Sequence, residues 1–274
     1  MSLIIENKYK ILKKLGEGSF GKVFIGENTN TKKEVAIKID KEQGAGGIQL
    51  RNEARIYRDL GDMKGIPAMR SFGTQGDYSY LVIDLLGKTL EETCKTQGNK
   101  LSLKVVILIG LQMIKRVEDL HIRGIIHRDI KPANFIFGKQ ESKSLLHIVD
   151  FGLAKFYKNS DEEHIPMETG RNLTGTLEYA SLNVLRGITP SRRDDLEAIC
   201  YILIFLLEGK LPWADNTNDR ERDIPLHEPL ISNYLSNHPG EFITFIRYCR
   251  NLKFNEEPNY LYLAGLLKNL QQIA

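Results

Sequence analysis

Apolar positions in the first third of the chain alternate with polar ones or form short β-branched runs, and turn-forming residues separate these runs. This pattern is typical of strands. A glycine-rich stretch at 44–47 is expected to break the chain before a helix over 48–60, where apolar residues recur at helical spacing. The predicted strands cover residues 9–15, 22–26, 34–40, 68–73 and 78–85.

From about residue 87 onward the periodicity becomes helical. A long helix is predicted over 103–121, and two more over 241–252 and 260–270. The segment 196–207 is apolar nearly all round, which in a soluble chain indicates a helix at the centre of a large core.

The change of pattern near Leu86 and Gly87 indicates an α+β fold with two lobes. A β-rich N-terminal lobe of about residues 1–86 is expected to join, through a short hinge, a mainly helical C-terminal lobe of about residues 87–274. Clefts between lobes are favoured places for ligand sites. A ligand site is therefore expected near the hinge.

Composition narrows the class of protein. Of 274 residues, 42% are hydrophobic and 27% are charged, which suffices for a sizeable core and excludes wholesale disorder. The net charge of +3 is too small to indicate a nucleic-acid partner, and none is expected. The cysteines are odd in number and far apart, so we expect buried free thiols at Cys94, Cys200 and Cys249.

No targeting or membrane segment is expected. The first residues lack the basic and apolar regions of a secretory leader, and no glycine follows Met1 for myristoylation. The most apolar stretch, 199–207, is shorter than the roughly 20 residues that span a bilayer. We expect an intracellular protein, cytoplasmic or nuclear, without a membrane partner and without a long tail after its last helix.

Residues 16–23 match the pattern G-x-G-x-x-G-x-V, in which glycines let backbone N–H groups approach a phosphate. A dinucleotide-binding loop of similar pattern must open a helix. Here a strand, a turn and a second strand follow, ending in Val35-Ala36-Ile37-Lys38. That order favours the loop and lysine of a protein kinase. We expect Lys38 to form an ion pair with Glu53, although Glu42 is an alternative partner.

Two further motifs follow. Residues 127–134 read His-Arg-Asp-Ile-Lys-Pro-Ala-Asn, and residues 150–152 read Asp-Phe-Gly. Phosphoryl transfer needs positioning and charge neutralisation rather than covalent work by the protein. Asp129 is the candidate to accept or orient a hydroxyl group, and Asp150 and Asn134 are hard oxygen donors suited to Mg²⁺. Any one motif can occur by chance, but all of them in this order are a specific signal.

With these motifs the sequence resembles the eukaryotic protein kinases and, more narrowly, the casein kinase 1 family, from about residue 9 to residue 270. Where most kinases have Ala-Pro-Glu, residues 179–183 read Tyr-Ala-Ser-Leu-Asn, similar to the Ser-Ile-Asn of that family. Further matches are Gly65-Ile66-Pro67, Gly76-Asp77-Tyr78, Leu85-Leu86-Gly87, His164-Ile165-Pro166, residues 172–176 and 191–197, and Leu211-Pro212-Trp213.

The resemblance implies a single protein kinase domain over residues 1–274, with the bilobal fold, that transfers the γ-phosphate of Mg-ATP to serine and threonine hydroxyls of protein substrates. It implies a monomer. It assigns catalysis to Asp129, Lys131 and Asn134, metal binding to Asn134 and Asp150, and bracing of the catalytic loop to Asp195. The residues it implies for ATP binding are Leu15, Gly16, Glu17, Gly18, Ser19, Phe20, Gly21, Val23, Ala36, Lys38, Glu53, Ile83, Asp84, Leu86, Ile136 and Val149.

Departures from the family pattern bear on specificity. Ala133 replaces an aspartate, Glu178 replaces an arginine that holds an anion beside the substrate, and residues 214–223 mix both charges where relatives are basic. We expect a weakened preference for phosphate-primed or acidic substrates, because a carboxylate repels the anion that arginine pairs with. Arg171 is expected to keep part of the attraction.

Alternatives remain at this point. The vaccinia-related kinases have an acidic residue at the position of Glu178, but usually His-Gly-Asp in place of residues 127–129. A nucleotide-dependent oxidoreductase is disfavoured by the strand after the glycine loop. A catalytically dead scaffold is disfavoured because the expected residues are all present, namely Lys38, Asp129, Asn134 and Asp150. Without Ala-Pro-Glu, we expect other contacts to hold the activation segment and activity without prior phosphorylation. Arg192 and Arg193 are expected to be a solvated flank of the buried helix.

Overall fold

A computed structural model describes residues 3–18, 21–214, 235 and 237–272. The chain divides into two compact units, one comprising Met1–Lys88 and Ile136–Ala154, the other Thr89–Phe135 and Lys155–Ala274. The first division lies close to the predicted hinge. The expected division assigned every residue after 86 to the second lobe. In the structure, Ile136–Ala154 belongs to the first unit instead.

Backbone hydrogen bonds explain why this segment joins the first unit. Gly87 N–H donates to Phe137 O at 2.8 Å, and Phe137 N–H donates to Lys88 O at 3.0 Å. Farther along, Ile148 N–H donates to Gly65 O at 3.0 Å. These contacts join positions far apart in sequence, so local periodicity could not reveal them.

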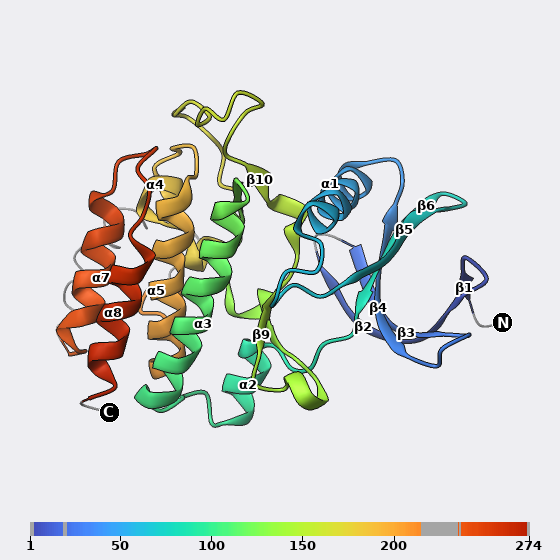
Figure 1. The fold of residues 1–274 in the computed structure, drawn as a ribbon, viewed down its shortest axis with the longest axis horizontal. Coiled ribbons are helices and arrows are strands. Elements are labelled where there is room, and N and C mark those ends of the chain that lie inside the picture. Colours follow the sequence, from blue (N-terminus) through green and yellow to red (C-terminus); the bar gives the residue numbers. More distant parts are fainter. Residues whose placement is uncertain (1–2, 19–20, 215–234, 236, 273–274) are drawn as a thin grey trace. The chain divides into compact units, whose positions relative to one another are not determined.

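A six-stranded antiparallel sheet, in the order β1-β2-β3-β4-β6-β5, is the main element of the first unit (Figure 1). It confirms the predicted strands and adds the two-residue strand β1. The strands are β1 (Ile4–Ile5), β2 (Tyr9–Gly18), β3 (Gly21–Asn28), β4 (Glu34–Lys41), β5 (Met69–Gln75) and β6 (Tyr78–Asp84). The apolar cluster of the sheet contains Ile5, Tyr9, Val35, Ile37, Tyr80 and Val82.

The helix α1 (Ala45–Leu60) begins three residues earlier than predicted, so the glycine-rich stretch does not break the chain before it. Gly46 and Gly47 lie in its first turn, where the absence of side chains allows close packing. A Cβ at Gly46 would lie 2.0 Å from Asp40 Oδ2, and one at Gly47 would lie 2.2 Å from Glu42 O. The rest of the first unit holds η2 (Gln140–Ser142), β9 (Leu146–Ile148), which pairs with β8 (Phe135–Phe137), and η3 (Phe151–Leu153).

The second unit is mainly helical. Helix α5, coloured orange in Figure 1, packs against α3 and α7, and α8 packs against α3 and α7. The elements are α2 (Leu90–Thr96), α3 (Leu103–Ile122), β7 (Ile125–Ile126), η1 (Pro132–Asn134), β10 (Lys155–Phe156), η4 (Leu177–Tyr179), α4 (Leu182–Leu185), α5 (Arg192–Glu208), α7 (Gly240–Asn251) and α8 (Tyr260–Leu270). The predicted long helices are confirmed, and the short α2 and α4 were not predicted.

Helix α5 occupies the core, as its sequence predicts, and almost every side chain from Leu196 to Leu206 is buried. It begins four residues before the predicted start because Arg192 and Arg193 belong to it. The expectation that this arginine pair is solvated is wrong. Arg192 is buried over the ring of Tyr157 and donates to Asn255 O at 2.8 Å, and Arg193 donates to Leu252 O at 2.6 Å.

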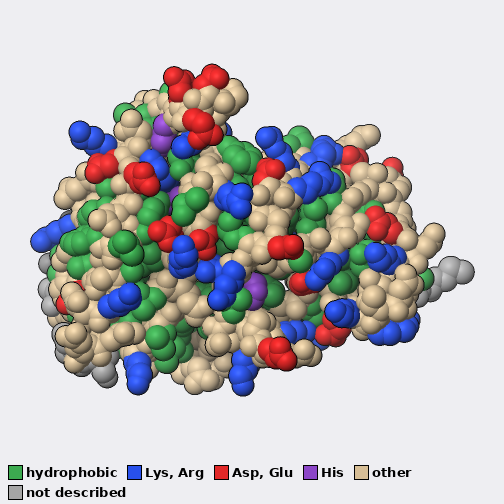
Figure 2. Space-filling model, in the orientation of Figure 1, with side chains coloured by type: hydrophobic (Ala, Val, Ile, Leu, Met, Phe, Trp, Pro, Cys, Tyr) green, Lys and Arg blue, Asp and Glu red, His purple; other side chains and the backbone are tan. Residues whose placement is uncertain are grey.

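The cysteines, the helices and the surface charges bear on the expectations drawn from composition. Cys94, Cys200 and Cys249 are buried free thiols, as predicted. Within the described ranges, none of the helices combines the length and apolarity needed to cross a membrane. On the face drawn in Figure 2, basic and acidic side chains are interspersed, apart from a group of acidic side chains on the loop after β10, where Asp161, Glu162 and Glu163 are exposed.

Truncating α5 tests its central position. Leu203 is fully buried, and Leu203→Ala should lower the free energy of unfolding by about 2–5 kcal/mol because it leaves a cavity. Leu108→Ala on α3 is the matched control, since that side chain is 49% exposed, and it should change stability by less than about 1 kcal/mol. Urea unfolding followed by fluorescence measures both. Equal shifts in midpoint would contradict the assignment of α5 to the core.

Candidate active site

The glycine-rich segment is the hairpin between β2 and β3, where Gly18 pairs with Gly21. Gly21 has a φ of 97°, and a Cβ there would lie 2.5 Å from Ile39 O, so this position requires glycine. Ser19 and Phe20 lie outside the described residues. Leu15, Gly16 and Glu17 lie exposed on β2 just before the hairpin.

Strand register places several of the predicted nucleotide-binding residues on one face of the sheet. Val23 is opposite Lys38, and Ala36 is opposite Ile83. Because opposed residues in an antiparallel pair share a face and alternate residues return to it, Val23, Ala36, Lys38 and Ile83 lie on the same face. The apolar cluster that contains Val35 and Ile37 lies on the other face.

The remaining residues predicted to bind ATP lie at or just after the end of β6 and in the segment Ile136–Ala154. Asp84 N–H donates to Ala68 O at 3.1 Å, and its carboxylate holds Arg70 at 2.6 and 2.8 Å. Leu86 follows, half-buried, and Ile136 is half-buried too. Val149, directly before Asp150, is 9% exposed.

Lys38 lies between two carboxylates. Its Nζ is 2.7 Å from Glu53 Oε2 and 2.7 Å from Asp150 Oδ1. Burial alone would lower the pKa of Lys38, but Glu53 and Asp150 reverse this and raise the pKa above that of an ordinary lysine. Burial also raises the pKa of Glu53, against the opposing effect of Lys38. Lys38 is therefore a fixed cation that projects from β4 to Glu53 on α1 and to Asp150.

The choice between Glu53 and Glu42 is settled by these contacts. Glu53, on α1, is 2% exposed and bonds Lys38. Glu42 pairs with Arg51 and accepts from Ser79 Oγ instead. Glu53 lies on the buried face of α1 with Leu50, Ala54 and Tyr57, so the helical periodicity over 48–60 could have favoured it.

Helix α1 also holds the segment that carries Asp150. Phe151 is fully buried, and its ring packs edge-on against Tyr57 with centroids 5.0 Å apart. Asn52 Nδ2 donates to Ala154 O at 3.0 Å. Asp150 itself has φ 67° and ψ 71°, in the left-handed region that non-glycine residues rarely adopt. Its surroundings maintain that strained conformation and so direct the carboxylate to Lys38.

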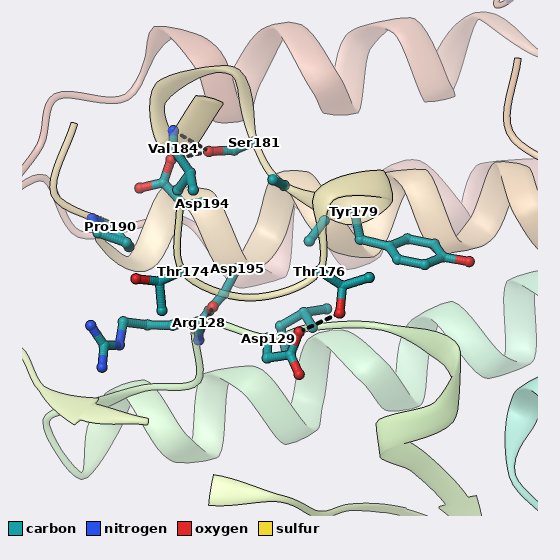
Figure 3. Close-up of a pocket in the computed structure, with 13 residues that line it drawn as sticks. Arg128, Asp129, Thr174, Thr176, Tyr179, Ser181, Val184, Pro190, Asp194 and Asp195 are labelled. Carbon is teal, nitrogen blue, oxygen red and sulfur yellow. Dashed lines mark hydrogen bonds between the residues drawn. The ribbon is translucent and has the colours of Figure 1, made fainter. Parts of the chain in front are cut away.

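In the second unit, Asp129 lies in a compact polar group (Figure 3). Thr176 Oγ1 donates to Asp129 Oδ1 at 2.8 Å, Lys131 Nζ is 2.8 Å from Asp129 Oδ2, and the same Nζ is 3.1 Å from Thr176 Oγ1. Asn134 Nδ2 donates to Asp129 O at 2.8 Å. The catalytic residues expected from sequence are therefore together in this unit. Thr176 was recognised only as part of a family motif, because nothing in its local sequence shows which carboxylate it contacts.

Asp195, at the start of α5, holds the backbone of the same loop. Its carboxylate accepts from His127 N–H at 2.7 Å and Arg128 N–H at 2.9 Å. Burial would raise the pKa of Asp195, but its contacts with His121 and His127 outweigh this and lower it. An ionised carboxylate thus fixes the backbone at Arg128, whose φ is 67°.

Other contacts hold the segment that follows Thr176. Ser181 Oγ donates to Asp194 Oδ1 at 2.5 Å and accepts from Val184 N–H at 3.2 Å, which caps α4. Burial raises the pKa of Asp194 to about 6, although hydrogen bonds from Ser181 and Ser191 oppose the shift. A cavity of about 30 Å³ lies among Asp129, Thr176, Tyr179, Ser181 and Asp194, which Figure 3 draws.

The model of the family described as the protein kinase domain matches residues 9–258. This range contains both groups of polar residues described above. The chain belongs to the protein kinase family. The kinase is thus a phosphotransferase whose substrates are ATP and a protein, and members of the family usually require a divalent metal.

The side chains of the kinase suit a hard cation such as Mg²⁺. The amide nitrogen of Asn134 is engaged by Asp129, which leaves the amide oxygen as the atom to bind a metal. Asp150 supplies a carboxylate whose side chain is 22% exposed. Over the described ranges, no three His, Cys, Asp or Glu side chains are grouped to hold a metal ion. The carboxylate and the amide oxygen are each hard donors of the kind that Mg²⁺ prefers.

Neutralising Glu53 tests the arrangement around Lys38. Glu53→Gln removes one of its two carboxylate partners, so we expect kcat/KM for ATP to fall at least about tenfold. Glu42→Gln is the matched control, because Glu42 is the alternative partner that the structure places elsewhere, and its effect should be less than about threefold. Steady-state assays at varied ATP concentration distinguish the two. A larger loss from Glu42→Gln would refute the assignment.

Proposed function

We propose that this kinase is a serine/threonine protein kinase of the casein kinase 1 type, transferring the γ-phosphate of Mg-ATP to protein hydroxyl groups. The observation that carries the proposal is the triangle formed by Asp129, Lys131 and Thr176. It presents a carboxylate for the acceptor hydroxyl and an ammonium for the transferred phosphate within a few ångströms of each other.

Each residue then has a chemical role. Asp129 orients the acceptor hydroxyl and takes its proton as the hydroxyl oxygen bonds to the γ-phosphorus, while the bond from that phosphorus to the β,γ-bridging oxygen breaks. Lys131 neutralises charge on the phosphate in transfer. Lys38, held by Glu53, binds the α- and β-phosphates. Bound Mg²⁺ supplies further charge neutralisation, and Asp150 and Asn134 Oδ1 are the residues that would hold it.

Contacts among the distinguishing motifs support the casein kinase 1 type. Ser181, the first residue of the Ser-Leu-Asn that stands where most kinases have Ala-Pro-Glu, bonds Asp194 in the motif that spans 191–197. Asn183 Nδ2 also lies 3.4 Å from Asp194 Oδ1. Trp213 Nε1 donates to Glu178 O at 2.8 Å, which joins a third motif to the same segment. Residues that depart together from the general kinase pattern therefore contact one another.

The expected substrate preference rests on the charges near this segment. Glu178 is half-buried just after Thr176, in the position that carries arginine in many relatives. Arg171, the residue expected to retain some attraction for anions, forms an ion pair with Glu168. This pairing supports a preference for phosphate-primed substrates weaker than that of typical relatives. Of the mixed-charge stretch 214–223, only residue 214 lies within the described residues.

The role of Asp129 can be tested by one substitution. Asp129→Asn keeps the shape but removes the base, so kcat should fall at least about a thousandfold while ATP affinity stays within about twofold. Asp161→Asn, on the exposed loop after β10, is the control and should keep full activity. Calorimetry gives the ATP affinity, and radiolabelled transfer to a Ser, Thr or Tyr peptide gives the rate and the acceptor. Full activity of Asp129→Asn, or transfer only to tyrosine, would overturn the proposal.

Substrate preference is tested with one peptide in primed and unprimed forms. The wild-type kinase should use the two within about threefold, because Glu178 repels the priming phosphate. Glu178→Arg should raise kcat/KM for the primed form about tenfold and leave the unprimed form nearly unchanged, since arginine pairs with phosphate in bidentate fashion. A strong primed preference in the wild-type kinase, unaffected by Glu178→Arg, would contradict this reading.

A further inference from the structure

A chain of buried polar side chains connects the start of α8 with the catalytic loop. Tyr260 OH lies 2.8 Å from His121 Nδ1, and His121 Nε2 lies 3.1 Å from Asp195 Oδ2. Tyr260 is 8% exposed, and His121 and Asp195 are 2% and 3% exposed. Asp195 in turn holds the backbone N–H groups of His127 and Arg128, directly before Asp129.

Proton positions along this chain follow from Asp195. Its ionised carboxylate can only accept, so the hydrogen bond from His121 requires a proton on Nε2. Burial, reinforced by nearby Arg192 and His127, lowers the pKa of His121 against the opposing effect of Asp195, and the ring is neutral. A neutral ring with a proton on Nε2 has an acceptor at Nδ1, which Tyr260 satisfies by donating its hydroxyl hydrogen. Tyr260 therefore supports the tautomer that Asp195 requires, by donating to the nitrogen that carries no proton.

The backbone carbonyl of His121 also has a buried partner. Tyr157 OH donates to His121 O at 2.6 Å, and the guanidinium of Arg192 lies over the Tyr157 ring. His121 and Tyr260 border a cavity of about 460 Å³. Its other titratable and charged lining residues are Tyr157, Lys158, Glu162, His164, Arg192 and Glu257.

We propose that His121 is a positioning residue for Asp129, acting through Asp195, and that Tyr260 holds His121 in the required tautomer. The inference rests on the role proposed for Asp129. Three donors, rather than two, hold the Asp195 carboxylate in one orientation, and that orientation fixes the loop backbone. The proposal lets His121 and Tyr260 act only through Asp195, so their loss should act on the rate of transfer and not on nucleotide affinity.

Substitutions at His121 separate hydrogen bonding from packing. His121→Phe keeps an aromatic ring but removes the donor, and kcat should fall about ten- to a hundredfold with KM for ATP within twofold. His121→Gln places an amide N–H near the position of Nε2 and should restore kcat to within about threefold of wild type. His121→Asn is too short to reach Asp195 and should stay impaired, which keeps the test valid should His121→Phe fail to fold.

At the other end, Tyr260→Phe should lower kcat about three- to tenfold and change the ¹⁵N signals of His121, which report the tautomer. Tyr262→Phe, also in the first turn of α8 but 41% exposed, is the matched control and should change neither. Unchanged kcat in both His121→Phe and Tyr260→Phe would overturn the inference, as would equal kcat for the Gln and Asn variants. A fully active Asp129→Asn variant would instead refute the proposed function itself.

Discussion

The conformation of the loop that carries Asp129 depends on one buried anion, the carboxylate of Asp195. An unpaired charge inside a core is costly, and it persists only where donors surround it. Here the donors are two consecutive backbone N–H groups and a histidine ring. Satisfying the carboxylate therefore dictates the path of the loop that carries Asp129, including the strained conformation at Arg128. The apolar surroundings of α5 make that requirement strict, because no solvent competes for the carboxylate.

Sequence patterns predicted elements well where periodicity is local. Strands β2, β3, β4, β5 and β6 and the helices α3, α7 and α8 were predicted to within a few residues, because their apolar faces repeat at a constant interval. The predicted start of α1 was wrong, because glycine usually interrupts helices. Here Gly46 and Gly47 belong to the helix, and their lack of side chains lets its first turn pack closely against Asp40 and Glu42. The prediction that Arg192 and Arg193 are solvated was also wrong. The backbone carbonyl groups and the tyrosine ring that contact them belong to segments far away in sequence.

The candidate site was predictable as a set of residues but not as a set of contacts. Motif spacing identified Lys38, Asp129, Asn134 and Asp150, since phosphoryl transfer restricts which side chains can do the work. It left Glu42 and Glu53 unresolved, and it did not assign Thr176 a role. Both depend on which side chains meet after the chain folds. The link from Tyr260 through His121 to Asp195 joins three helices and has no local signature at all.

The placement of Ile136–Ala154 has a consequence for how the two substrates are recognised. The ammonium of Lys38 and the carboxylate of Asp150 belong to the same compact unit, so their pairing is internal to it. Asp129 and Thr176 belong to the other unit. Under the proposed roles, a change at Thr176 therefore acts on recognition of the acceptor without disturbing the ion pair between Lys38 and Asp150.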